Sequence, residues 1–180
     1  AALVAHGSYE IVVVDDGSTD DTFAVLRAAA AQNNAIRFVR LSRNFGHQAA
    51  LRAGLRNARG RFVISMDADF QHDPADVKRF VVEFDEGHDY ILGSRFIKGG
   101  SIPINWGLKR VFLSKFGNLF IRSTLWLWNI HDFTTGFRLA RVKGFLDQID
   151  FHKLFSKSYA YKIALLYEMR HRGAKIKEIP

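Results

Sequence analysis

The chain has 180 residues and a mass of 20.5 kDa, the size of one domain or of part of a larger protein. Hydrophobic residues make up 48% and charged residues 24%, which excludes a globally disordered chain. The absence of cysteine excludes a disulfide scaffold and a thiolate metal site. No apolar stretch is long enough to predict a transmembrane helix, and the first residues lack the pattern of a signal peptide.

The net charge of +8 is unevenly distributed along the chain. Residues 1–93 carry 10 Lys+Arg against 13 Asp+Glu, and residues 94–180 carry 16 against 5. Acidic groups at strand ends are suited to hold a metal ion, whereas a basic face suits phosphate, nucleic acid or an anionic membrane surface. The alternative is a solvated surface without a partner.

The first half of the sequence alternates between strand and helix patterns. We expect strands over 10–14, 36–41, 61–66 and 89–94, and helices over 18–32, 47–58 and 74–86. Ser18 and Asp21 resemble a capping box at the start of the first helix. The alternation predicts a parallel α/β sheet with right-handed crossovers, whose ligands bind beyond the carboxyl ends of the strands.

The second half has a different pattern. We expect a loop over 98–101, a long helix over 106–128, a further helix over 158–171 and a last strand over 174–179. In the long helix one face is apolar: Phe112, Phe116, Leu119 and Phe120. A separate polar stripe recurs every four residues: Arg110, Ser114, Asn118 and Arg122. All three tryptophans of the chain lie here, which favours a helix at a membrane surface over a core helix.

The sharpest chemical signal is Asp67-Ala68-Asp69, directly after a predicted buried strand. Two carboxylates one residue apart can coordinate a hard divalent cation, and Gln71 adds a neutral oxygen ligand. Such a cation can hold a diphosphate and neutralise the charge that develops on it.

A second acidic pair, Asp15-Asp16, follows the first predicted strand. This pair is expected to form a tight turn. One of its carboxylates can also bind a base or a ribose, as acidic residues at such strand ends do. The chain has no Gly-x-Gly-x-x-Gly and no P-loop motif, which disfavours dinucleotide enzymes and P-loop NTPases.

Four segments together resemble an inverting glycosyltransferase of family 2 with the GT-A fold: residues 13–20, 43–46, 66–74 and 93–95. Later segments, at 105–114, 132–138 and 175–180, resemble polyprenyl-phosphate (dolichol-phosphate) mannosyltransferases. The resemblance implies a GT-A (Rossmann-like) α/β fold with a mostly parallel sheet flanked by helices. It places a nucleotide-sugar-binding part at 1–96 and an acceptor-binding part with membrane-interface helices at 97–180.

The resemblance also assigns roles to individual residues. Mg²⁺ or Mn²⁺ would be held by Asp67, Asp69 and Gln71. The donor, GDP-mannose, would be bound by Asp15, Asp16, Gly46, Asp67, Ala68 and Asp69. The acceptor phosphate would be bound by Arg95, Arg110, Ser114 and Arg138. Catalytic roles would belong to Asp67, Asp69, Arg95 and Asp132.

The expected function is metal-dependent transfer of mannose from GDP-mannose to a polyprenyl phosphate at the cytoplasmic face of a membrane. The chain would be peripheral there, with any anchor outside it. A lipid monophosphate is largely a dianion at pH 7, so it needs no general base, and Asp132 would serve as a base only for a hydroxyl acceptor.

Three alternatives to mannose transfer stay open. A related enzyme would transfer glucose or another sugar to undecaprenyl phosphate. A non-catalytic remnant would only bind a nucleotide sugar, and a basic nucleic-acid-binding module is disfavoured by the acidic clusters. The family's first strand, expected beside residues 10–14, and a segment after Pro180 lie outside the resemblance. We therefore expect the chain to be a fragment, unstable alone.

Overall fold

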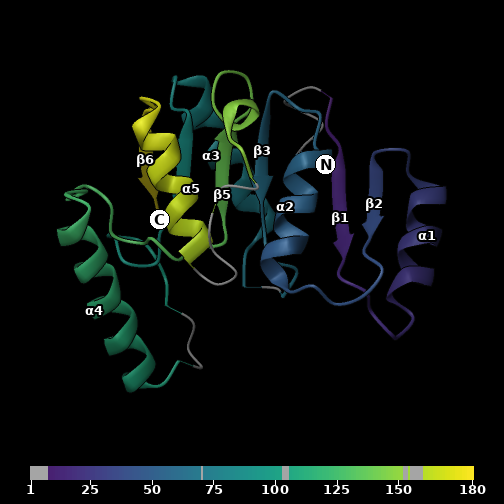
Figure 1. Ribbon diagram of the computed structural model, residues 1–180, viewed down its shortest axis with the longest axis horizontal. Helices are drawn as coiled ribbons and strands as arrows, with labels where there is room; N and C mark the ends of the chain where they lie inside the picture. The colour runs from purple at the N-terminus through teal and green to yellow at the C-terminus, as the bar shows by residue number, and fades with distance from the viewer. Residues whose placement is uncertain (1–7, 70, 103–105, 152–153, 155–159) are drawn as a thin grey trace.

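The computed structural model describes residues 8–69, 71–102, 106–151, 154 and 160–180, and it shows an α/β architecture (Figure 1). The strands are β1 (Ile11–Asp15), β2 (Ile36–Arg40), β3 (Phe62–Ser65), β4 (Tyr90–Gly93), β5 (Arg138–Arg141) and β6 (Ile176–Ile179). The α-helices are α1 (Thr22–Gln32), α2 (His47–Asn57), α3 (Val77–Asp85), α4 (Leu108–Thr124) and α5 (Ala160–His171). Short 3₁₀ turns, η2 (Pro74–Asp76) and η3 (Leu146–Gln148), complete the order. The predicted α/β class is confirmed. The expectation of a parallel sheet is wrong in part, because β5 runs antiparallel to both of its neighbours.

The strands form two sheets. β1 and β2 pair in parallel, and a four-stranded sheet has the order β3-β5-β4-β6. β4 and β6 are parallel, whereas β5 runs antiparallel to both β3 and β4. Within the described residues, β1 pairs only with β2 and β3 only with β5. The division between the sheets thus lies beside β1, where the resemblance places the family's first strand.

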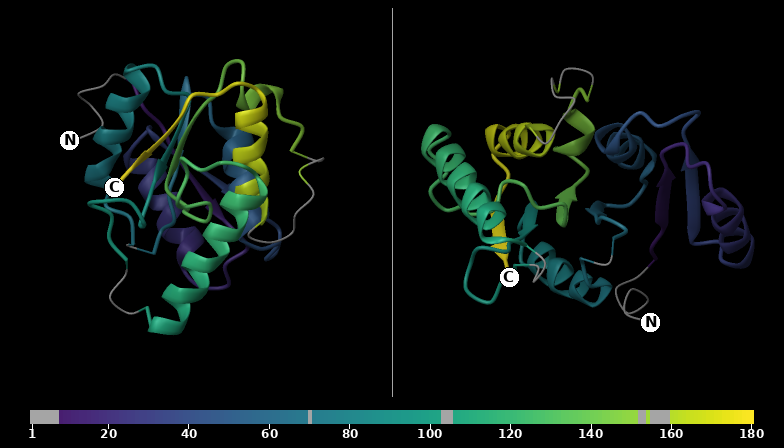
Figure 2. Two further views of the ribbon diagram at one scale, coloured as in Figure 1. Left: turned by 90° about the vertical axis from the view of Figure 1, so that its left-hand side faces the viewer. Right: turned by 90° about the horizontal axis from the view of Figure 1, so that it is seen from below.

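Two apolar cores cover opposite faces of the four-stranded sheet, because successive side chains of a strand point to opposite sides. On one face Tyr90 and Leu92 pack against α5, and on the other Ile91 packs against α3. Figure 2 shows α3 and α5 on opposite sides of this sheet. The alternation of burial along β4 therefore fixes which helix covers which face.

The strand directions bring one end of each of β3, β4 and β5 to a common edge of the sheet. β3 and β4 both run antiparallel to β5, so their carboxyl ends lie beside the amino end of β5. Ser65 and Leu92 are both in register with Arg138, the first residue of β5. Residues that follow β3 and β4 and residues that precede β5 must consequently meet at this edge.

Several expected elements differ in detail from the observed ones. The capping box is wrong: α1 begins at Thr22, Asp21 makes no side-chain cap bond, and the Ser18 amide donates instead to Asp15. The expected helix over 106–128 is shorter, and Trp126 beyond it has a φ of 54°, which an α-helix does not allow. β5 was not predicted, because its four residues are flanked by motif residues rather than by a clear strand pattern.

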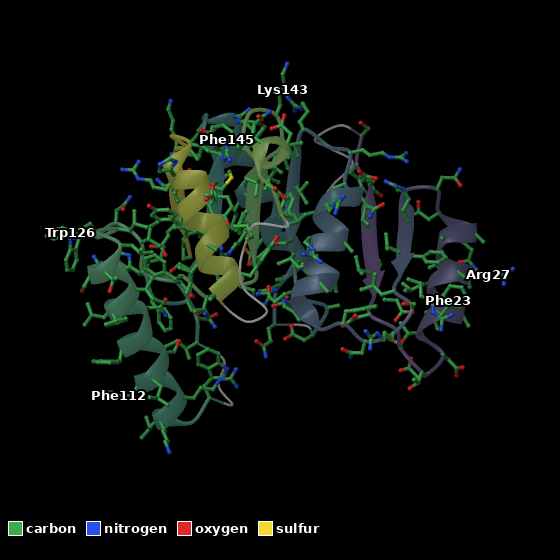
Figure 3. All side chains as sticks on the ribbon, in the orientation of Figure 1. Phe23, Arg27, Phe112, Trp126, Lys143 and Phe145 are labelled. Carbon is green, nitrogen blue, oxygen red and sulfur yellow. The ribbon has the colours of Figure 1, made fainter. Side chains whose placement is uncertain are left out.

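α4 projects from the body of the molecule (Figure 1), and its apolar side chains are largely exposed. The exposed apolar side chains on and just after it are Leu108, Phe112, Leu113, Phe116, Leu119, Phe120, Trp126 and Trp128. Figure 3 shows the labelled Phe112 and Trp126 pointing away from the rest of the chain. In the described part of the chain, no helix has the length and apolarity that crossing a membrane requires.

Candidate active site

Asp67, just beyond β3, lies at the centre of the candidate site. His47 Nε2, at the start of α2, is 3.6 Å from its Oδ1, and Lys162 Nζ, from α5, is 3.9 Å from its Oδ2. A methyl group at Gly136 would lie only 2.3 Å from Oδ2, so the loop before β5 passes directly against this carboxylate. The Asp67 amide donates to His72 Nδ1, and burial lowers the pKa of His72. His72 thereby fixes the turn that follows β3.

Two carboxylates of this turn, Asp67 and Asp69, are of the type that binds divalent cations together with phosphate groups. The partners of Asp67 stand beyond hydrogen-bond distance, which leaves its oxygens available as ligands. Asp69 and Gln71 are exposed, and Asp69 Oδ1 accepts from the Gln71 amide. Mg²⁺ is commonly bound by one or two carboxylates plus substrate phosphates, so two aspartates are sufficient.

The only group of three potential metal-binding side chains among the described residues is elsewhere: Glu83, Glu86 and His88, at the end of α3. This group precedes β4, at the edge of the sheet opposite to Asp67. Sequence analysis did not single it out, and nothing connects it to the candidate site.

The acidic pair at the end of β1, of which Asp15 is the last residue of the strand, organises a turn. Asp15 is buried, accepts from the Ser18 amide at 2.8 Å and lies 3.4 Å from Arg40 Nε. Hydrogen bonds from Ser18 and the charge of Arg40 lower the pKa of Asp15. Asp16 accepts from the amides of Phe45 and Gly46, each at 2.8 Å.

These bonds connect the acidic pair to Asp67. Asp16 holds the Gly46 amide, and the next residue, His47, reaches Asp67. The turn requires glycine at Gly17, which has a φ of 71° and where a methyl group would lie 2.4 Å from the Arg43 backbone. Beyond β1 and β2 an open polar hollow is lined by residues 17–20 and 40–42. Residues 17–20 thus belong both to this turn and to the wall of the hollow, and the turn is joined to Asp67 through Gly46 and His47.

The buried Asp132 and the half-buried Arg95 form an ion pair at the same edge. Arg95 Nε donates to Oδ2 at 2.7 Å and Nη2 donates to Oδ1 at 2.8 Å, and Thr134 also donates to the carboxylate. Burial alone would raise the pKa of Asp132, but the hydrogen bonds and charge of Arg95 outweigh it, and this pKa is lowered. A carboxylate with several donors and a low pKa is a poor general base. Glu178 of β6 braces the loop by accepting from the amides of His131 and Asp132.

Arg138 is buried at the start of β5, and its guanidinium donates to Tyr90 Oη and to three backbone carbonyls. The carbonyls belong to Thr135, Phe133 and Lys162. These contacts tie the loop before β5 to α5. They do not support direct contact of Arg138 with an acceptor phosphate, and we propose that Arg138 holds the site in shape instead.

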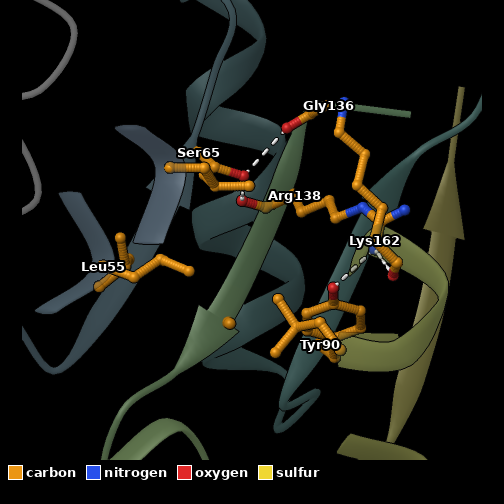
Figure 4. A pocket seen from close by; sticks show the side chains of 10 residues that line it. Leu55, Ser65, Tyr90, Gly136, Arg138 and Lys162 are labelled. Carbon is orange, nitrogen blue, oxygen red and sulfur yellow. Dashed lines mark hydrogen bonds between the residues drawn. The ribbon is translucent and has the colours of Figure 1, made fainter. Parts of the chain in front are cut away.

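Sequence reasoning missed Lys162 and His47. Burial lowers the pKa of Lys162, whose side chain is only 6% exposed. Figure 4 shows Lys162 beside Arg138, with its side chain directed toward Gly136. On the other side of this glycine, Ser65 Oγ donates to the Gly136 carbonyl at 2.9 Å. The sequence signal for Lys162 was a charged residue within the apolar pattern of α5, and for His47 its position directly after Gly46.

Arg110, a predicted acceptor residue on α4, lies against the same aromatic ring as Arg95. Arg110 Cζ lies 4.1 Å and Arg95 Cζ 5.0 Å from the centre of the Trp106 ring. Ser114 is half-buried one turn further along α4, and Asn118 attaches the helix to the loop by accepting from the Phe133 amide. The structure thus brings Asp67, Asp132 and Arg95 to one edge and extends it through Trp106 to Arg110.

Comparison with known proteins agrees with the family resemblance that the sequence motifs indicate. Residues 2–147 match the family model described as glycosyl transferase family 2. The polyprenol monophosphomannose synthase of Mycolicibacterium smegmatis is 34% identical over 174 residues, which are 94% of this chain and 64% of that protein. The dodecaprenyl-phosphate galacturonate synthase of Rhizobium johnstonii is 42% identical over 98 residues, 53% of this chain and 29% of that protein. The chain therefore spans less than two thirds of the length of either relative.

Proposed function

Because this chain belongs to glycosyl transferase family 2, we propose that it transfers mannose from GDP-mannose to a polyprenyl phosphate, with the help of a divalent metal ion. The observation that carries the proposal is the contact between Asp67 and the loop of Asp132. This loop holds Arg95, and at Gly136 it approaches the Asp67 carboxylate so closely that a methyl group would not fit. An acidic donor side and a basic acceptor side therefore share one edge.

On the donor side, Asp67, Asp69 and Gln71 would hold Mg²⁺ or Mn²⁺ against the diphosphate. The ion would supply positive charge that stabilises the departing nucleoside diphosphate. The polar hollow beyond β1 and β2 is the proposed place of the nucleoside, and the buried Asp15 holds the amide of Ser18, which lines the hollow. Asp16 and Gly46 would act indirectly, since their polar groups form the turn between the hollow and Asp67.

On the acceptor side, Arg95 and Arg110 would position the phosphate of the lipid, with Ser114 one turn away. An acceptor phosphate oxygen then forms a bond to the anomeric carbon while the bond from that carbon to the diphosphate breaks, and the nucleoside diphosphate leaves. The phosphate is already ionised near neutral pH, so no residue has to remove a proton. Asp132 would orient Arg95, which agrees with the lowered pKa of this carboxyl group.

The exposed apolar face of α4 would rest on the membrane surface that contains the lipid acceptor. This helix has no acidic residue and carries Lys109, Arg110, Lys115 and Arg122. Apolar and basic groups on one exposed helix are the combination that binds anionic lipid interfaces. We place this contact at the cytoplasmic face of a membrane, with the chain attached peripherally and no nucleic acid as a partner.

A second donor stays a candidate because the galacturonate synthase shares 42% identity with half of this chain. The decisive assay follows transfer of labelled sugar to a short-chain polyprenyl phosphate with Mn²⁺ or with a chelator. GDP-mannose, UDP-glucose and a nucleotide-activated galacturonate are compared as donors. Product from GDP-mannose alone supports the proposal, whereas product only from another donor overturns the assignment of mannose. Calorimetry with a short duplex DNA should detect no binding.

The metal assignment is tested by Asp69→Asn, which removes one anionic ligand from a site with few protein ligands. We expect a loss of at least about a hundredfold in transfer rate, or about 2.7 kcal/mol of transition-state stabilisation. The control is Asp85→Asn, an exposed carboxylate at the end of α3, which should retain full activity. Activity of Asp69→Asn within about threefold of wild type would exclude this aspartate as a metal ligand.

A further inference from the structure

Trp106 is the aromatic ring that Arg95 and Arg110 share. Their guanidinium carbons lie 5.0 and 4.1 Å from its centre, within the range of cation–π interactions. Two cations on one ring repel each other, and this repulsion falls when an anion binds between them. The ring therefore holds two phosphate-binding side chains, one from the end of β4 and one from α4, at a single place.

The indole N–H of Trp106 is buried and has no hydrogen-bond partner in the described structure. Buried polar groups are nearly always satisfied, and one left unsatisfied costs stability. An acceptor oxygen supplied by a bound ligand would satisfy it. The indole group is thus a donor without a protein acceptor, on the ring that also carries the two cations.

The surroundings favour an anion as that ligand. The sequence contains no Asp or Glu between Asp89 and Asp132. Among the described residues the Arg110 guanidinium makes no hydrogen bond or ion pair, and the Arg95 guanidinium uses Nε and Nη2 but not Nη1. Donors on three side chains are consequently available to one anionic group. Arg110 is exposed and lies against the ring, so its side chain can change position when that group binds.

We propose that Trp106 is a further residue of the acceptor site, which positions Arg95 and Arg110 with its ring and donates its indole N–H to the acceptor's phosphate monoester. The inference rests on the proposed function for the identity of the acceptor as a lipid phosphate. It adds a residue that selects a phosphate oxygen by a directed hydrogen bond, whereas the arginines supply mainly charge.

Two substitutions separate the two roles. Trp106→Phe keeps an aromatic ring and removes the N–H, and calorimetry should show a rise of about three- to tenfold in the Kd of farnesyl phosphate. Trp106→Leu removes ring and N–H together, and the rise should reach about thirtyfold or more. The Kd of GDP should stay within about twofold of wild type in both variants, since the donor side does not touch this ring. Tyr167→Leu, an exposed aromatic on α5, is the matched control and should leave both constants unchanged.

A spectroscopic measurement reports the hydrogen bond directly. The ¹⁵N-indole resonance of Trp106, assigned by its loss in Trp106→Phe, should move downfield when farnesyl phosphate is added and stay in place when GDP is added. A resonance that farnesyl phosphate does not move, or a Trp106→Phe variant with wild-type affinity, overturns the assigned hydrogen bond. If Trp106→Leu raises the Kd of GDP by the same factor as the Kd of farnesyl phosphate, the assignment of Trp106 to the acceptor side is overturned.

Both measurements follow phosphate monoester binding in the absence of donor and metal. Intact binding at Trp106 in a protein that transfers no sugar would therefore count against the proposed function alone. Active transfer without this binding would count against the role of Trp106 alone.

Discussion

Gly136→Ala tests whether the contact between the acceptor loop and Asp67 matters for catalysis. The added methyl carbon would lie 2.3 Å from Oδ2, 2.9 Å from Cγ and 3.1 Å from Oδ1 of Asp67. Normal contact between these atoms needs more than 3 Å, so the carboxylate or the loop has to move by about 1 Å. The Asp67 carboxylate is the end of a half-exposed side chain and can move at little cost to the fold.

A displacement of this size in a positioned catalytic group costs about a hundredfold in rate, or about 2.7 kcal/mol. We therefore expect kcat/KM for sugar transfer to fall by about that factor and the Mn²⁺ concentration for half-maximal activity to rise. The free energy of unfolding should fall by no more than about 1 kcal/mol, because the clash is relieved by a half-exposed side chain. Transfer assays with a short-chain acceptor and urea denaturation measure the two quantities.

The control is Gly54→Ala in α2, where a methyl group meets Val14 at an ordinary distance of 3.4 Å. This change should preserve activity and can raise stability by up to about 1 kcal/mol, since alanine favours a helix. Wild-type activity in Gly136→Ala would refute the placement of Asp67 in the reaction. A loss of stability as large as the loss of transition-state stabilisation would show that the glycine matters only for folding.

Two further predictions concern acid stability and membrane binding. The pKa of Asp132 is lowered in the folded state, so the ionised carboxylate stabilises the fold above the ordinary carboxyl pKa of about 4. This stabilisation is lost as the pH falls through the folded value. Urea denaturation at several pH values should show that the free energy of unfolding depends less on acid pH in Asp132→Asn than in the wild type. Equal acid dependence in the two proteins would contradict this. On α4, cosedimentation should show binding to anionic vesicles that weakens with salt, because each basic residue near the surface contributes about 1 kcal/mol of electrostatic attraction. Phe112→Asp should reduce this binding, whereas the control Val82→Asp, on the exposed side of α3, should not. Binding to neutral vesicles as strong as binding to anionic vesicles would contradict the electrostatic contribution.

The sequence by itself determined the α/β class, the family and the edge of the sheet at which the candidate site lies. Buried β-branched runs followed by Asp15 and Asp67 predict strands with acidic carboxyl ends, because side-chain patterns and turn residues act over a few positions. Local patterns also indicated that α4 has an apolar and a basic side. These features depend on neighbours in the chain, so a sequence displays them directly.

Only the tertiary structure decided which distant residues share the site. The antiparallel insertion of β5 between β3 and β4 brings Gly136 to Asp67 across about seventy positions, and no local pattern encodes that register. The same packing places Lys162 beside Asp67 and directs Arg138, which the sequence had placed with the acceptor, into the interior. Trp106 gained significance in the same way, because only the fold shows that two arginines from separate elements meet on its ring.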